Sequence, residues 1–226
     1  FYFDLAYSKD PQEPGLYWAG FVDTRHAWTF APYDMFKTTN KNSMGQKLDL
    51  ESAGSGQKGM MIVEHLKPEA RANILGVEAQ VWSETIKGRE MLEYYTLPKL
   101  IGFAESAWAA EREWETIENR AEREQRIQEE WNVNANILAQ KELPRLSYLN
   151  GGYNYRVPPP GAVIEEGTLK ANVEYPGLII RYTIDGTEPI ASSTRFEGPV
   201  KVAGSVRLKS FDTAGKASRT VSAVQH

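Results

Sequence analysis

The chain has 226 residues, of which 41% are hydrophobic and 25% charged, and its formal net charge at pH 7 is −4. This composition is that of a globular protein with enough apolar material for one core or two, and it excludes disorder of the whole chain. The acidic balance disfavours nucleic acid and anionic lipid as partners, and no apolar run approaches the roughly 18 residues that insertion into a membrane requires. Cysteine is absent, which excludes disulfides, thiolate zinc sites and cysteine nucleophiles.

The remaining composition favours one kind of ligand over others. His26, His65 and His226 are far apart in the sequence and lack the spacing of metal ligands, so we expect no metal and no other cofactor. Six tryptophans and eleven tyrosines are many for this length. Such rings are apolar bodies with a polar edge, and they stack on the C–H face of a sugar while its hydroxyls find polar partners. The composition therefore favours carbohydrate chemistry.

The first half of the chain predicts two buried strands separated by a long connection. Phe1–Leu5 is a short aromatic and aliphatic run, and Ile74–Trp82 is a second, with Ser83 and Glu84 at its carboxyl end. No Met precedes Phe1, so we expect the chain to be the C-terminal piece of a longer protein. The connection is much longer than usual and is expected to be functional or to contain helices, with an unpatterned and mobile stretch at Asn40–Gly59.

Helices are predicted after the second strand. Apolar residues recur at spacings of three and four from about Arg89 to Ala110, with a kink at Pro98, and the charged segment Glu111–Trp131 predicts a solvated helix. The predicted elements follow the order of the last units of a (β/α)8 TIM barrel, namely a strand, a long loop, a second strand and a helix. In that fold functional groups sit at the carboxyl ends of strands, where Asp4 and Glu84 are expected.

The composition changes near residue 150 and predicts two domains. Residues 1–150 are assigned to the C-terminal part of a TIM barrel, with its last two strands and following helices. Residues 151–226 are assigned to a small immunoglobulin-like β-sandwich. Its strands are expected at Thr168–Glu174, Leu178–Ile184, Val200–Val202, Val206–Phe211 and Ser218–Val224, with glycine at the turns. The fold class is thus α/β followed by all-β.

Several motifs in this order resemble a known family. They are Phe1–Asp4, Gly15–Trp18, Glu78–Glu84, Leu97–Lys99 and Ala104–Trp108, followed by Tyr155–Gly161 and Tyr182–Pro189. Together they resemble glycoside hydrolase family 20, specifically bacterial chitobiases (β-N-acetylhexosaminidases), and the tail resembles the immunoglobulin-like C-terminal domain of those enzymes. The resemblance covers nearly the whole chain.

The resemblance implies a retaining exo-β-N-acetylhexosaminidase that releases terminal N-acetylglucosamine from chitobiose and chitin oligosaccharides. The 2-acetamido oxygen of the substrate is the nucleophile and forms an oxazolinium intermediate, an exception to the two-carboxylate scheme. The acid/base Asp-Glu pair of the family matches no part of this sequence, so it is expected upstream, in the N-terminal remainder of the enzyme. The isolated chain is then expected to be inactive, and the relatives imply a periplasmic, outer-membrane or secreted location. The alternative is a non-catalytic carbohydrate-binding or interaction module.

Five site residues follow from the resemblance. Tyr2 matches the catalytic tyrosine that donates to the acetamide oxygen, and Asp4 and Glu84 match carboxylates that accept from sugar hydroxyls. Trp82 matches the ring beneath the −1 sugar, and Trp18 an aromatic platform for the next sugar. Asp4 is expected on the strand face of Tyr2, and Glu84 on that of Trp82, because each pair is two residues apart. The alternatives are core packing for Tyr2 and Trp82 and simple packing for Trp18. For the acids they are a capping or loop carboxylate for Asp4 and a helix N-terminal acid for Glu84.

Overall fold

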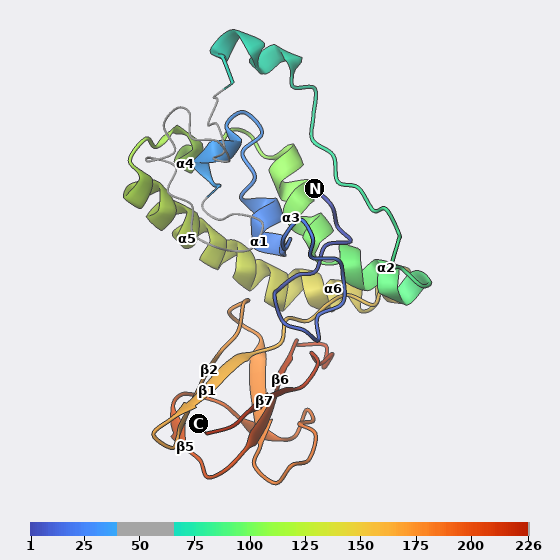
Figure 1. The fold of residues 1–226 in the computed structure, drawn as a ribbon, viewed down its shortest axis with the longest axis vertical. Coiled ribbons are helices and arrows are strands. Elements are labelled where there is room, and N and C mark those ends of the chain that lie inside the picture. Colours follow the sequence, from blue (N-terminus) through green and yellow to red (C-terminus); the bar gives the residue numbers. More distant parts are fainter. Residues whose placement is uncertain (40–65, 226) are drawn as a thin grey trace. The chain divides into compact units, whose positions relative to one another are not determined.

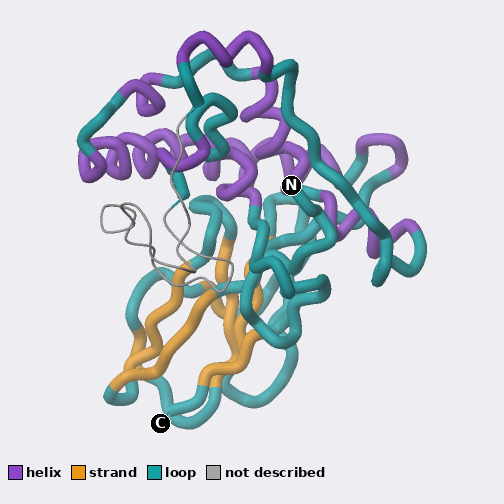
Figure 2. Tube along the Cα trace, turned by 45° about the horizontal axis from the view of Figure 1, so that its top comes forward, coloured by secondary structure: helices purple, strands orange, loops and turns teal. Residues whose placement is uncertain are grey.

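The structure is a computed structural model that describes residues 1–39 and 66–225 (Figure 1). The chain forms two compact units, Phe1–Ile127 and Gln128–His226. In the described residues the named strands all lie in the second unit, and the first is built of helices and loops (Figure 2). The stretch at Asn40–Gly59 that was expected to be mobile lies outside the described residues, as do His65 and His226.

Both predicted helices of the first half are formed in two pieces, and that expected over Glu111–Trp131 is divided into Glu113–Thr116 and Arg120–Ile137. The helix expected over Arg89–Ala110 is divided at Leu97 and Pro98, because proline lacks the N–H that would continue the helix. Pro98 is the N-cap of the second piece. The described elements are α1 (Thr24–Trp28), the 3-10 turns η1 (Met35–Lys37) and η2 (Pro68–Asn73), α2 (Arg89–Thr96), α3 (Lys99–Trp108) and α4 (Glu113–Thr116).

The two predicted strands of the first unit are not formed as such. Tyr2 and Gln80 make one isolated parallel bridge, and the described residues around them contain no regular strand. Leu75 is 96% exposed, so the prediction that Ile74–Trp82 is buried is wrong. A parallel strand becomes regular and buried when it has neighbours on both edges and helices on both faces, and the described residues supply only isolated bridges here, Tyr2 with Gln80 and Leu5 with Leu16. The TIM barrel stays a prediction.

The core of the first unit lies where α1 crosses α3. Gly102 is the contact point, since a Cβ placed on it would lie 2.4 Å from the carbonyl oxygen of Thr24. Glycine is therefore needed for the close approach of the two backbones. Large side chains complete this core, including Phe3, Leu5, Tyr7, Trp28, Tyr95 and Trp114.

The second unit begins inside a helix, earlier than the change in composition. Helix α5 (Arg120–Ile137) continues through a π-helical turn, η3 (Leu138–Glu142), into α6 (Leu143–Leu146) and the 3-10 turn η4 (Leu149–Gly151). Trp131 of α5 is buried, and its ring meets that of Tyr175 edge-on at 6.1 Å. Trp131 thus packs against the segment between β2 and β3, although the composition around it is that of the first half. The domain boundary between 150 and 151 stays a prediction.

Two antiparallel sheets form the rest of the second unit. One has the order β1-β2-β5 and the other β4-β3-β6-β7. The core lies between them, because its buried residues come from both sheets: Ile164, Leu169, Ile180, Val206, Leu208 and Ala223. The strands are β1 (Gly161–Glu165), β2 (Thr168–Asn172), β3 (Ile179–Thr183), β4 (Thr194–Arg195), β5 (Val200–Lys201), β6 (Val206–Phe211) and β7 (Val221–Ala223).

All five predicted strands of this unit are present, and two were missed. The missed strands are β1, which follows three prolines, and β4, which has only two residues. Gly177, Gly186, Gly204 and Gly215 all have positive φ, as the predicted turns require. The small all-β region after residue 151 is confirmed by its antiparallel sheets, while its immunoglobulin-like connectivity stays a prediction. No helix in the described part of the chain is long and apolar enough to cross a membrane.

A buried hydrogen bond ties the segment before β1 to the residue that follows β6. The hydroxyl of Tyr155 donates to the carboxylate of Asp212, and the two residues are 1% and 3% exposed. Burial raises the pKa of Tyr155, and the hydrogen bond to Asp212 and its negative charge raise the pKa further. The native state therefore favours the protonated phenol.

Replacing Tyr155 with phenylalanine is expected to lower the free energy of unfolding by about 1–3 kcal/mol, because a buried carboxylate oxygen loses its donor. Because the pKa of Tyr155 is raised in the native state, this group contributes its full stabilisation at pH values below the unfolded-state pKa of about 10. The contribution is lost as the pH rises above that value. Urea unfolding of the parent chain and of Y155F at several pH values checks both effects. The difference between the two chains should be constant from about pH 7 to 9 and shrink above about pH 10; a constant difference would contradict the assignment.

Candidate active site

Three of the predicted site residues lie together as exposed aromatic rings. The centroid of the Tyr2 ring is 6.1 Å from that of Trp18 and 6.1 Å from that of Trp82. Trp18 is 67% exposed, Trp82 60% and Tyr2 37%. The rings come from segments far apart in the sequence, and we call them the aromatic cluster. Exposed tryptophans grouped in this way form a surface on which a flat, partly apolar ligand can stack.

Backbone pairing explains why these three segments meet. The segment Phe1–Leu5 lies between the other two: the Phe3 N–H donates to the Gln80 carbonyl at 2.9 Å, and the Leu16 N–H donates to the Asp4 carbonyl at 2.9 Å. Trp18 follows Leu16 by two residues, and Trp82 follows Gln80 by two. Pairing on both sides of one segment therefore brings both indoles toward the Tyr2 ring.

Gly15 allows the Trp18 segment to approach this closely. Its φ is +131°, and a Cβ placed there would lie 2.6 Å from the backbone nitrogen of Ala6. Any other residue at position 15 would force the two backbone segments apart. The Gly15–Trp18 motif thus has a local physical reason: the glycine places the loop and the tryptophan supplies the ring.

Asp4 does not share an exposed face with Tyr2. The Leu5 N–H donates to the Tyr2 carbonyl at 3.3 Å, so these residues form a turn, the Tyr2–Leu5 turn, and the strand alternation does not apply. Asp4 is only 2% exposed, and its Oδ1 has no hydrogen-bond partner among the described residues. A buried carboxylate oxygen without a donor is costly, and this acceptor is available to a hydroxyl that reaches the turn.

Glu84 lies exposed at a bend directly after the aromatic cluster. Ser83 has a φ of +59°, in the left-handed region that costs a non-glycine residue about 1 kcal/mol. This conformation reverses the backbone between Trp82 and Glu84, so the expected common strand face is again absent. The side chain of Thr85 is hydrogen-bonded to the hydroxyl of Tyr95 at 3.3 Å, which ties the bend to α2. The roles of Asp4 and Glu84 stay predictions.

Sequence reasoning missed the group that supports the Tyr2–Leu5 turn. The ammonium of Lys99 is fully buried and donates to the carbonyl oxygens of Phe3 and Leu5. A signal was present, since a lysine opens an otherwise apolar helix in the Leu97–Lys99 motif. The motif alone does not show which groups the Lys99 side chain contacts.

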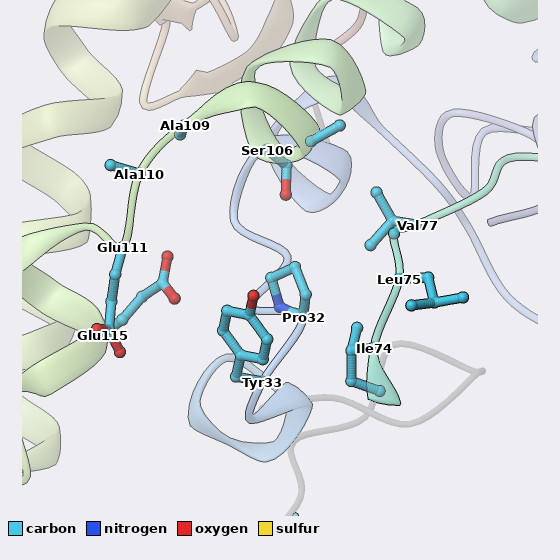
Figure 3. A pocket seen from close by; sticks show the side chains of 12 residues that line it. Pro32, Tyr33, Ile74, Leu75, Val77, Ser106, Ala109, Ala110, Glu111 and Glu115 are labelled. Carbon is cyan, nitrogen blue, oxygen red and sulfur yellow. The ribbon is translucent and has the colours of Figure 1, made fainter. Parts of the chain in front are cut away.

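A separate hollow in the first unit contains none of the five predicted site residues. Figure 3 shows Ile74, Leu75 and Val77 on one side of it, Glu111 and Glu115 on the opposite side, and Pro32 and Tyr33 between them. The aromatic cluster therefore lies on the surface and not in this hollow. No group of three or more His, Asp or Glu residues in the described ranges could hold a metal ion.

Comparisons with known proteins identify both parts of the chain. Residues 1–111 match the model of the glycosyl hydrolase family 20 catalytic domain, and residues 142–220 match that of the chitobiase/beta-hexosaminidase C-terminal domain. The aromatic cluster lies wholly in the first match. Both matches are to domains of the glycoside hydrolase class. The chain belongs to glycosyl hydrolase family 20.

Named relatives agree with this family. The N,N'-diacetylchitobiase of Vibrio harveyi is 32% identical, over 98% of this chain and 24% of its own length. The beta-hexosaminidase of Vibrio vulnificus is 32% identical, over 82% of this chain and 22% of its own length. The beta-N-acetylhexosaminidase of Cellulomonas fimi is 28% identical over 53% of this chain. The chain thus spans about a quarter of the length of these two Vibrio relatives.

Proposed function

We propose that the chain is the C-terminal segment of a retaining exo-β-N-acetylhexosaminidase that removes terminal N-acetylglucosamine from chitobiose and chitin oligosaccharides. The observation that carries this proposal is the aromatic cluster, in which Tyr2, Trp18 and Trp82 come together from three segments with their rings exposed. A pyranose has C–H faces that stack on such rings and hydroxyls at its edge. The family membership of residues 1–111 supports the same substrate class.

In this proposal each residue of the cluster has a separate task. Trp82 stacks beneath the sugar at the −1 position, and Trp18 provides a platform for the next sugar. The hydroxyl of Tyr2 donates to the carbonyl oxygen of the 2-acetamido group and aligns it with the anomeric carbon. A donor held in place in this way is most effective when charge develops in the transition state. Asp4 and Glu84 accept hydrogen bonds from sugar hydroxyls.

The reaction then has two steps. The acetamido oxygen attacks the anomeric carbon, the bond to the leaving oxygen breaks, and an acid from the N-terminal remainder of the enzyme gives that oxygen its proton. Water next attacks the anomeric carbon of the oxazolinium and gives up a proton to the same group, so the configuration is retained. No enzyme nucleophile is needed. The described residues contribute alignment and sugar binding, and the proton transfers belong to the acid/base pair proposed upstream.

Hydrolysis of a chromogenic N-acetylglucosaminide tests the function directly. The full-length enzyme that contains this chain is expected to release the chromophore, whereas the 226-residue chain alone should not, because it lacks the acid for the leaving oxygen. Hydrolysis by the purified chain would contradict the proposed division of labour. Binding of chitobiose by the full-length protein without hydrolysis would favour the second function, a carbohydrate-binding module.

The partners of the chain in this proposal are the oligosaccharide and the N-terminal remainder of the same enzyme. Nucleic acid is not proposed as a partner, given the net charge of −4. A periplasmic, outer-membrane or secreted location is proposed from the substrate, since chitin fragments are met at or outside the cell surface. Fractionation of cells with antibody against the C-terminal unit would test the location.

A further inference from the structure

The most costly buried group near the aromatic cluster is the side chain of Lys99. Lys99 is 0% exposed, and burying an ammonium group costs several kcal/mol unless acceptors surround it. Lys99 is also the first residue of α3, where the helix dipole disfavours a positive charge. A methionine of similar length would fill the same space without either cost. The cation is therefore retained for its contacts.

The Lys99 ammonium contacts the residues on either side of Asp4 in the sequence. The Nζ atom donates to the carbonyl oxygen of Phe3 at 2.8 Å and to that of Leu5 at 2.6 Å. These carbonyls precede and follow Asp4, inside the Tyr2–Leu5 turn. One ammonium that binds two carbonyls of the same turn fixes their separation, and with it the direction in which the turn presents Tyr2.

The lysine is itself held in place. The ring of Tyr7 lies 3.9 Å from Nζ, and its hydroxyl accepts from the Lys99 N–H at 3.5 Å. Tyr7 packs edge-on against Tyr94 of α2 at 6.1 Å, and the Tyr94 hydroxyl donates to Glu13 at 2.8 Å. A cation with an aromatic face beneath it and two carbonyls above it has little freedom to move. Helices α2 and α3 thus hold the Tyr2–Leu5 turn in place through the rigid side chain of Lys99.

We propose that Lys99 is a positioning residue, whose buried ammonium fixes the Tyr2–Leu5 turn so that the Tyr2 hydroxyl meets the acetamide of the substrate. This inference rests on the proposed function. Lys99 does not touch the substrate and acts through Tyr2. Its loss removes no stacking ring and displaces the donor. The effect should therefore fall on kcat more than on KM.

A double-mutant cycle in the full-length enzyme tests the proposal. K99M should lower kcat by about 10–10²-fold, the cost of a displacement of about 1 Å at a reacting group, with KM changed by less than about threefold. In a Tyr2→Phe background, where no hydroxyl remains to be aligned, K99M should lower kcat by less than about threefold. Equal losses in both backgrounds would overturn the proposal.

Arg112 offers a matched control. Its side chain is 11% exposed and also binds two backbone carbonyls, those of Trp28 and Phe30, but this segment carries no proposed site residue. R112M should leave kcat within about threefold of the parent, whatever its effect on the melting temperature. An equal loss of kcat in R112M would mean that Lys99 acts through general stability, and this overturns the proposal.

The remaining outcomes are also decisive. If K99M does not fold, K99Q, which keeps an amide donor and no charge, replaces it in the cycle. If neither folds while R112M does, Lys99 is a folding residue and the proposal is wrong. A parent enzyme that hydrolyses no N-acetylglucosaminide contradicts the proposed function itself, whereas an active parent with an additive cycle contradicts the role of Lys99 alone.

Discussion

Replacing Tyr2 with phenylalanine in the full-length enzyme is expected to lower kcat by about 10²–10³-fold, as for other preorganised donors. The substitution removes one hydroxyl and keeps the ring that packs 6.1 Å from both indoles of the aromatic cluster. Because stacking is retained, KM should change by less than about threefold. Steady-state kinetics on a chromogenic N-acetylglucosaminide measures both constants.

The control for Y2F is Y148F. Tyr148 is 70% exposed in the second unit and belongs to no proposed site, so its hydroxyl should be dispensable. Near-native kcat in Y2F would show that Tyr2 is a packing residue and that another group aligns the acetamide. A large loss in Y148F would show that the assay responds to changes unrelated to the site.

Replacing Trp82 with alanine should produce a different pattern of kinetics. The indole is 60% exposed and forms one side of the aromatic cluster, so its removal deletes a stacking surface that ground state and transition state both use. KM should therefore rise as kcat falls, and kcat/KM should drop by at least about tenfold. Michaelis constants of parent and variant, measured on chitobiose, check this.

Trp108 provides a control of the same residue type. It is 89% exposed at the end of α3 and lies outside the aromatic cluster. W108A should leave KM within about twofold of the parent. If W82A and W108A raise KM equally, the effect is one of general tryptophan loss, and the sugar does not stack on Trp82.

The local features of this protein could be predicted from its sequence because neighbouring residues determine them. Pro98 divides the helix of the first unit, since its ring and missing N–H act within one turn. Gly177, Gly186, Gly204 and Gly215 mark the turns of the second unit through their positive φ. The motifs that carry the family membership are likewise short stretches of chain, and the family models match the same regions.

The predictions that were wrong concern features that depend on contacts between segments far apart in the sequence. Ile74–Trp82 reads as a buried strand by its composition, yet Leu75 is almost fully exposed because burial requires neighbouring strands and helices. The alternation of side chains also misplaced Asp4 and Glu84, since the Tyr2–Leu5 turn and the left-handed Ser83 interrupt it. Alternation holds only while the backbone stays extended.

The sequence by itself determined the family and the identity of the aromatic residues, because ring types and motif order are present in the chain before it folds. The tertiary structure alone decided that Tyr2, Trp18 and Trp82 meet, since pairing on both sides of Phe1–Leu5 joins segments far apart in the sequence. It also decided that Lys99 lies beneath the turn. A lysine at a helix start is ordinarily solvated, and only the packing of α3 against this turn makes it a buried donor.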